Sequence, residues 1–144
     1  MTIGFAGDHA GYLLAAPIRK LLEERGITMV NFGTFGPESV DYPDFAHKLG
    51  EAVQKGEVDC GIAACGTGNG MAICLNKHTG VRAGLAWNRE IAALVKEHNN
   101  ANVLVLSQRF TSEQENLECV KAWLDTEFAG GRHQRRIDKI EQCR

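Results

Sequence analysis

Five short apolar runs recur along the chain, and each is followed by a segment whose apolar residues return every three or four positions. The runs are typical of buried strands over residues 3–6, 27–32, 60–64, 81–86 and 102–106. The segments after them have the spacing of amphipathic helices. Strands that alternate with helices in this way build a parallel sheet with helices on both faces. The pattern therefore predicts a single Rossmann-like α/β domain over residues 1–144, a three-layer sandwich around a five-stranded parallel sheet.

Local signals predict where several helices begin. Asp44 is predicted as the N-cap of the second helix, and Ser112 as the N-cap of the fifth, where Glu115 completes a capping box. Pro17 fits the first helix if its regular part begins near Ala15, and otherwise is expected to kink it.

The composition is that of an ordinary globular domain, with 44% hydrophobic residues, 24% charged residues and a net charge of −2. No apolar run reaches the about 18 residues of a membrane span, and a strand pattern starts at Ile3, where a signal peptide would lie. The five cysteines lack Cys-x-x-Cys pairs, which disfavours a disulfide framework and a zinc site. We therefore expect a cytoplasmic protein without a metal and without nucleic-acid or membrane partners.

The loop after the third strand carries the densest candidate chemistry. Residues 65–71 read Cys-Gly-Thr-Gly-Asn-Gly-Met, between that strand and a helix expected to end near Lys77. Glycines at alternate positions let backbone N–H groups converge on a small anion, and the helix N-terminus favours negative charge. Cys65 begins this loop, so we interpret it as an acid/base group beside a site for developing negative charge.

The same loop has less specific interpretations. It can be only a tight connection, and a buried cysteine is usually an inert apolar residue. A Walker A loop and a dinucleotide-binding fingerprint both fail on spacing, the latter because its third glycine, Gly70, comes one residue early. A cysteine phosphatase would need an arginine where Met71 stands.

Further polar clusters follow other strands, and in parallel sheets ligands bind beyond the carboxyl ends of the strands. These clusters are Asp8-His9, Asp41-Tyr42 and Gln108-Arg109. Asp8-His9 can alternatively be a helix cap. His98 closes the helix before strand five, so the topology does not guarantee that it reaches the same edge of the sheet.

The C-terminal segment is basic. Gly130-Gly131 is predicted to end the last long helix, and a separate helix is expected over residues 132–142. Arg132 and Arg136 are spaced i, i+4, so their guanidinium groups project together and suit a phosphate. A solvated basic face is the alternative. The glycine pair indicates that this helix reaches away from the body, onto a second subunit.

Together these motifs resemble type B ribose-5-phosphate isomerases, in the order of that family and over nearly the whole chain. The matching motifs are Asp8-His9-Ala10-Gly11, Asp41-Tyr42-Pro43, residues 65–70, Asn76-Lys77, residues 98–103 and residues 130–136. The resemblance implies an aldose–ketose isomerase that interconverts D-ribose 5-phosphate and D-ribulose 5-phosphate by ring opening and proton transfer through an enediolate. It implies no metal and no organic cofactor.

The resemblance also implies a role for each matching residue. Cys65 moves the proton between C2 and C1, and His98 opens the sugar ring with help from Thr67. The residues implied in substrate binding are Asp8, His9, Tyr42, Gly66, Thr67, Gly68, Asn69, Gly70, Asn99, Arg109, Arg132 and Arg136. Some members carry a glutamate as base one residue after the last loop glycine; Met71 stands there in this chain.

The family is dimeric, so the resemblance implies a homodimer in which residues 129–144 complete the partner's active site. Whether dimers pair into tetramers is left open. Two alternatives remain for the function: an isomerase of a related sugar phosphate (allose 6-phosphate, galactose 6-phosphate or a tetrose phosphate), and a non-catalytic sugar-phosphate-binding subunit.

Overall fold

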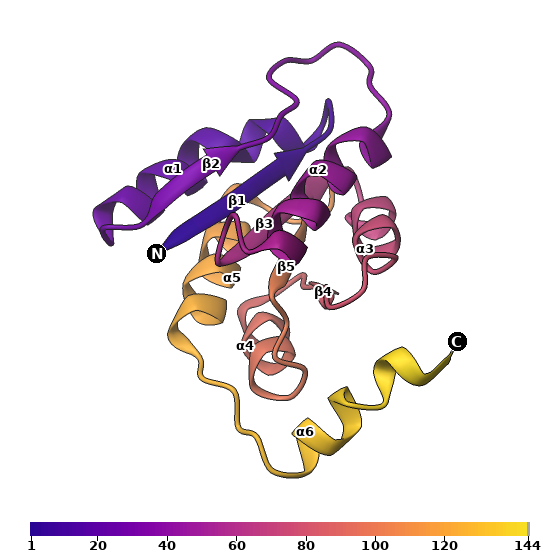
Figure 1. The fold of residues 1–144 in the computed structure, drawn as a ribbon. Coiled ribbons are helices and arrows are strands. Elements are labelled where there is room, and N and C mark those ends of the chain that lie inside the picture. Colours follow the sequence, from indigo (N-terminus) through magenta and orange to yellow (C-terminus); the bar gives the residue numbers. More distant parts are fainter. Residues whose placement is uncertain (144) are drawn as a thin grey trace.

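The computed structural model describes residues 1–143, and its centre is one parallel five-stranded sheet (Figure 1). The strands are β1 (Thr2–Gly7), β2 (Thr28–Asn31), β3 (Cys60–Cys65), β4 (Ala83–Leu85) and β5 (Val103–Ser107), in the spatial order β2-β1-β3-β5-β4. The three inner strands are almost wholly buried because helices cover both of their faces. The edge strands β2 and β4 are shorter than the sequence pattern predicts.

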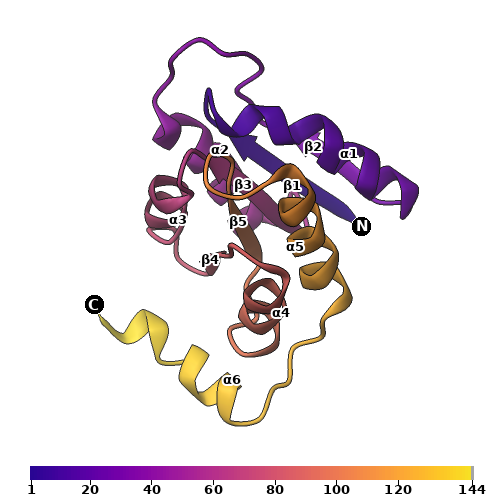
Figure 2. The same ribbon diagram turned by 180° about the vertical axis from the view of Figure 1, so that it is seen from behind.

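Five helices cover the sheet, and the two faces have separate cores. On one face α1 (Ala15–Glu24), α4 (Arg89–Glu97) and α5 (Glu113–Asp125) pack around the fully buried Trp123. On the other face α2 (Tyr42–Lys55) and α3 (Asn69–Leu75) pack around Leu49 and Leu75 (Figures 1 and 2). The predicted three-layer α/β sandwich is confirmed. No helix among residues 1–143 is both long and apolar enough to cross a membrane.

Two predicted helix starts are confirmed and one is wrong. A 3₁₀ turn over Gly11–Leu14 precedes α1, which begins at Ala15. The hydroxyl of Ser112 accepts the N–H of Glu115 at 3.1 Å and caps α5. The N-cap of α2 is Asp41 rather than Asp44, because Pro43 is accommodated in the first turn, where its missing N–H costs no helical hydrogen bond.

One predicted helix end is confirmed to within two residues, and one is wrong. α3 ends at Leu75, close to Lys77, where the Asn76 side chain exchanges two 2.8 Å hydrogen bonds with the backbone of Ala83 at the start of β4. α5 stops at Asp125, five residues before Gly130. There the Thr126 backbone becomes extended and its hydroxyl donates to the Ala122 carbonyl at 2.6 Å.

The C-terminal arm, residues 126–143, leaves the body and runs past the end of α4 (Figure 1). It contains α6 (Arg132–Ile137) and a 3₁₀ turn over Ile140–Cys143, so the single helix predicted over 132–142 is wrong. The chain tightens after Ile137: the Lys139 N–H donates to the carbonyl three residues before it, at Arg136, instead of four. Two short turns therefore replace one continuous helix.

Candidate active site

The loop between β3 and α3 places the Cys65 thiol at the carboxyl edge of the sheet. Cys65 ends β3 with 5% of its surface exposed, and its Sγ accepts the backbone N–H of Gly68 at 3.2 Å. Its carbonyl accepts the N–H of Gln108 at 2.9 Å, which ties the loop after β5 to the same point. An N–H directed at the sulfur stabilises negative charge there. This arrangement suits a thiol that acts as a base.

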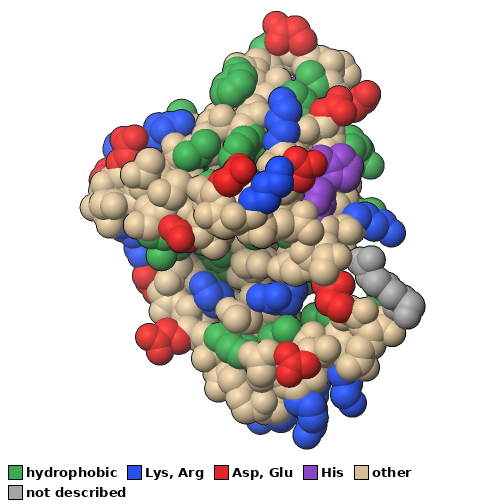
Figure 3. All heavy atoms as spheres, in the orientation of Figure 1, with side chains coloured by type: hydrophobic (Ala, Val, Ile, Leu, Met, Phe, Trp, Pro, Cys, Tyr) green, Lys and Arg blue, Asp and Glu red, His purple; other side chains and the backbone are tan. Residues whose placement is uncertain are grey.

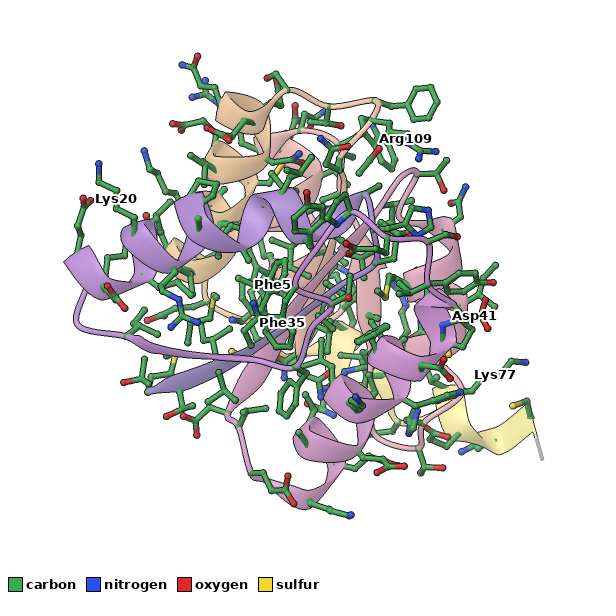
Figure 4. The ribbon with its side chains drawn as sticks, turned by 90° about the horizontal axis from the view of Figure 1, so that it is seen from above. Phe5, Lys20, Phe35, Asp41, Lys77 and Arg109 are labelled. Atoms are coloured by element: carbon green, nitrogen blue, oxygen red, sulfur yellow. The ribbon has the colours of Figure 1, made fainter. Side chains whose placement is uncertain are left out.

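The other loop glycines allow close neighbours. A Cβ on Gly66 would lie 3.3 Å from the Arg109 guanidinium, and a Cβ on Gly70 would lie 2.7 Å from the Tyr42 ring. The glycines thus bring Arg109 and Tyr42 against the Cys65 loop. Arg109 projects from the loop after β5, on the side of the molecule where Asp41 begins α2 (Figure 4).

The loop N–H groups are partly used within the loop itself. Gly68 donates to the thiol, and Asn69 donates to the exposed Thr67 hydroxyl at 3.1 Å. The convergence of these groups on one anion stays a prediction. Met71, where some relatives are implied to hold a glutamate base, is fully buried in the core under α2 and α3. It therefore leaves Cys65 as the base candidate on this loop.

Asp8 and His9 lie after β1, next to this loop. One carboxylate oxygen of Asp8 accepts hydrogen bonds from the N–H groups of Ala10 and Gly11, both at 2.9 Å. This oxygen therefore acts as a cap, as the alternative interpretation of Asp8 predicted. His9 Nδ1 accepts the N–H of Val40 at 3.1 Å. In the neutral ring the hydrogen is therefore on Nε2, which leaves Nε2–H as a donor for a ligand.

A second group of predicted site residues lies at the opposite edge of the sheet. His98 is the C-cap residue of α4, and Asn99 follows it. α4 returns from the carboxyl edge to the amino end of β5, where Val103 pairs with Gly61. Cys65 pairs with Ser107, four residues along the strands, which corresponds to about 13 Å at about 3.3 Å per residue. One chain therefore does not bring His98 to its own thiol.

Arg132 and Arg136 belong to this second group, because both lie exposed on α6 beyond the end of α4. The structure thus divides the predicted site residues into two sets. The carboxyl edge holds Asp8, His9, Tyr42, Cys65, Gly66, Thr67, Gly68, Asn69, Gly70 and Arg109. The amino edge holds His98, Asn99, Arg132 and Arg136.

Sequence reasoning missed two residues beside these sets. The Ser107 hydroxyl donates to the Gly66 carbonyl at 2.9 Å and so holds the β3 and β5 loops together. The His133 ring stacks on His98, with centroids 4.4 Å apart and planes 13° apart. Burial, followed by the positive charges of neighbouring groups, lowers the pKa of His133. The sequence signal for His133 was its place directly after Arg132 in the matching motif over residues 130–136.

A pair of histidines lies away from both sets. His47 Nδ1 on α2 is 2.7 Å from His78 Nε2 after α3, at a surface where Figure 3 shows histidine side chains together. Gln54 Oε1 accepts from His78 Nδ1 at 3.1 Å, so His78 accepts the His47 N–H. Burial, then the charge of His47, lowers the pKa of His78. No three His, Cys, Asp or Glu side chains among residues 1–143 are arranged to hold a metal ion.

Comparison with known proteins agrees with this architecture. A model of the family described as Ribose/Galactose Isomerase matches residues 3–140. Ribose-5-phosphate isomerase B of Escherichia coli is 41% identical over 138 residues, 96% of this chain and 93% of that protein. A putative sugar phosphate isomerase of Bacillus subtilis is 44% identical over 141 residues, 97% of this chain and 95% of that protein.

Solved structures give the same result. Ribose-5-phosphate isomerase B of Clostridium thermocellum superposes with a TM-score of 0.96 at 47% identity, covering 99% of this chain and 96% of that one. The Mycoplasma genitalium enzyme, solved with bound ribulose-5-phosphate, has a TM-score of 0.94 at 43% identity, covering 98% and 94%. The chain therefore belongs to the ribose/galactose isomerase family, in agreement with its resemblance to the type B ribose-5-phosphate isomerases.

Proposed function

We propose that this protein interconverts D-ribose 5-phosphate and D-ribulose 5-phosphate. The observation that carries the proposal is the Cys65 thiol, placed at a strand end with the Gly68 N–H 3.2 Å from its sulfur. A base near neutrality beside fixed N–H donors is what proton transfer next to a carbonyl requires. The relatives named ribose-5-phosphate isomerase B, one of them with ribulose-5-phosphate bound, support the five-carbon substrate.

In the proposed reaction Cys65, as the thiolate, removes the C2 proton of the open-chain aldose. The C–H electron pair becomes the C1–C2 double bond of an enediolate, and the C1 oxygen takes the proton that the C2 hydroxyl gives up. Return of the thiol's proton to C1 then leaves a carbonyl at C2 and a hydroxyl at C1, which is the ketose. Donors in the backbone of Gly66–Gly70 stabilise the enediolate, each contributing about 2.7–4 kcal/mol by analogy with oxyanion holes. The proton moves between adjacent carbons, so the step is balanced without an external oxidant or reductant.

The phosphate is proposed to lie where His9 and Arg109 face the loop, with Tyr42 and Asp8 toward the sugar. His9 contributes its Nε2–H, because Val40 occupies Nδ1. A charged group held far from the reacting carbons fixes the geometry of the proton transfer. His98, with Thr67 and Asn99, is proposed to open the furanose ring before the proton transfer begins.

We propose further that two chains form a homodimer with shared sites. His98, Asn99, Arg132 and Arg136 lie at the sheet edge opposite Cys65, so in a two-fold pair each chain's amino-edge set can complete the other's carboxyl-edge set. The C-terminal arm also leaves a cavity of about 560 Å³ beside β4, lined by apolar side chains such as Val81, Val95 and Ile140. A partner chain would fill it.

We place this activity in the cytoplasm. All five cysteines are free, and a thiol base works only where it stays reduced.

The decisive experiment follows ketose formation from D-ribose 5-phosphate by the purified chain with a metal chelator present. We expect turnover that the chelator leaves unchanged. No turnover by the pure chain would favour a binding subunit instead. Comparing kcat/KM for five-carbon and six-carbon aldose phosphates and for a tetrose phosphate separates the proposed substrate from its relatives. A kcat/KM about tenfold higher for a six-carbon substrate would overturn the substrate assignment, but the protein would still be an isomerase.

A further inference from the structure

The His133 ring is held against the His98 ring although the two residues are far apart in the sequence. The two rings are nearly parallel, with planes 13° apart and centroids 4.4 Å apart. The arm is also tied to α4 just before α6, where the Ala129 N–H donates to the Glu97 carbonyl at 3.0 Å. Both contacts lie at the last turn of α4. The arm therefore approaches His98 from a defined direction.

The short helix α6 has two distinct faces. His133 and Ile137, spaced i, i+4, are half-buried, whereas Arg132 and Arg136, with the same spacing, are exposed. The face that packs toward the body therefore belongs to His133, and the face available to a phosphate belongs to the arginines. A single rigid turn links the stacked ring to the arginines.

We propose that His133 is a positioning residue whose ring holds the His98 imidazole in the orientation needed for ring opening. The inference rests on the proposed function, in which His98 exchanges a proton with the sugar ring. Without a flat neighbour the partly exposed His98 ring can rotate about its side-chain bonds at the end of α4. A general acid/base works only within hydrogen-bond reach of its proton, so this freedom lowers the rate of ring opening.

The electrostatics of the pair agree with this role. Burial first, and then the charges of His98, Arg132 and Arg136, lower the pKa of His133, and Glu97 on α4 opposes them in part. A charged His133 beside His98 is therefore disfavoured. Two adjacent imidazolium rings would repel each other.

The test compares His133→Ala, which removes the ring, with His133→Phe, which keeps a flat ring without nitrogen atoms. Gln134→Ala is the matched control, because Gln134 lies exposed on the same helix and its side chain donates to Asp138 Oδ1 at 2.7 Å, away from the stacked rings. Steady-state kcat and KM for D-ribose 5-phosphate are measured on each variant. Size-exclusion chromatography and thermal unfolding verify that each variant keeps the wild-type assembly and fold.

We expect His133→Ala to lower kcat about tenfold with KM within about twofold of wild type, as for a misplaced catalytic group. His133→Phe should recover most of this loss, and Gln134→Ala should match wild type. The residual turnover of His98→Asn should use only substrate that is already in the open-chain form. Adding His133→Ala to this variant should therefore lower kcat no further, because there is no longer a His98 ring to position.

Four outcomes would overturn the inference: unchanged kcat in His133→Ala, an equal defect in His133→Phe, a loss that multiplies with that of His98→Asn, or a rise in KM alone. The last would show that His133 positions the phosphate-binding arginines instead. If the wild-type chain itself lacked turnover, the proposed function would fail first. The two failures are therefore distinguishable.

Discussion

The backbone N–H of Gly68 lies 3.2 Å from the sulfur of Cys65, and only glycine can hold it there. The φ of Gly68 is +85°, in the left-handed region, and a Cβ at this position would clash with the Leu85 side chain. The donor and the thiol therefore depend on one backbone conformation. Leu85 of β4 and the Leu106 carbonyl of β5 lie against Gly68, so the position of the donor beside the thiol depends on the packing of these two strands.

Replacing Cys65 by alanine tests the thiol directly. We expect turnover to fall by about 10²–10⁴-fold, the usual contribution of a general base, with binding of D-ribose 5-phosphate retained. Calorimetric titration and the kinetic assay give the two quantities. Cys60→Ala is the matched control at the other end of β3, where burial raises the pKa of the thiol to about 11 and it serves no predicted role. Near-normal turnover in Cys65→Ala would exclude the thiol from the chemistry.

Gly68→Ala tests the position of the N–H donor, because alanine keeps the N–H but its Cβ would clash with Leu85 and displace the backbone. We expect kcat to fall by about 10²–10³-fold if the donor acts like one of an oxyanion hole, and the protein to lose about 1–3 kcal/mol of stability from the strained backbone. Gly26→Ala is the control, since its φ is +74° but a Cβ there meets nothing within 4 Å. Urea unfolding and kcat are measured for both variants. Equal kcat in the two variants would mean that the N–H of Gly68 has no catalytic part.

Arg136→Ala tests whether the arginines of α6 bind the substrate phosphate. Hydrogen bonds to charged groups contribute about 1.5–3 kcal/mol, so KM for D-ribose 5-phosphate should rise about 10- to 100-fold while kcat changes less. Arg135→Ala, an exposed neighbour on α6, should leave KM unchanged. If both variants behave alike, the basic face of α6 is only solvated surface.

The His47–His78 pair predicts a pH dependence of stability. Burial and His47 lower the pKa of His78 in the folded protein from its ordinary 6.5, so the unfolded chain binds the proton more readily. The contribution of His78 is therefore fully present above about pH 6.5 and is lost as the pH falls below it. The free energy of unfolding by urea should drop between pH 7.5 and pH 5.5, and less steeply in His78→Gln. Equal pH slopes in the two proteins would contradict this assignment.

The sequence by itself determined the local structure, because local structure is encoded in local spacing. Alternating apolar runs predicted the five strands and the α/β class, and Ser112 with Glu115 marked the start of α5 correctly. Residues 65–71 also predicted a glycine-rich loop that begins with a thiol. Capping residues were less reliable where two candidates lie within one helical turn. At the start of α2 both Asp41 and Asp44 are possible N-caps, and the structure uses Asp41.

Only the tertiary structure decided how the candidate residues are grouped. The sequence assigned residues 129–144 to a partner's site but did not place His98. Strand register puts Cys65 and His98 at opposite edges of the sheet, and the stacking of His98 on His133 depends on the path of the arm after Thr126. These relations join residues tens of positions apart through packing, which no local pattern encodes. The periodicity of apolar residues indicates which face of a helix or strand is buried. It does not indicate which other element packs against that face, and that packing decides the distance between two residues.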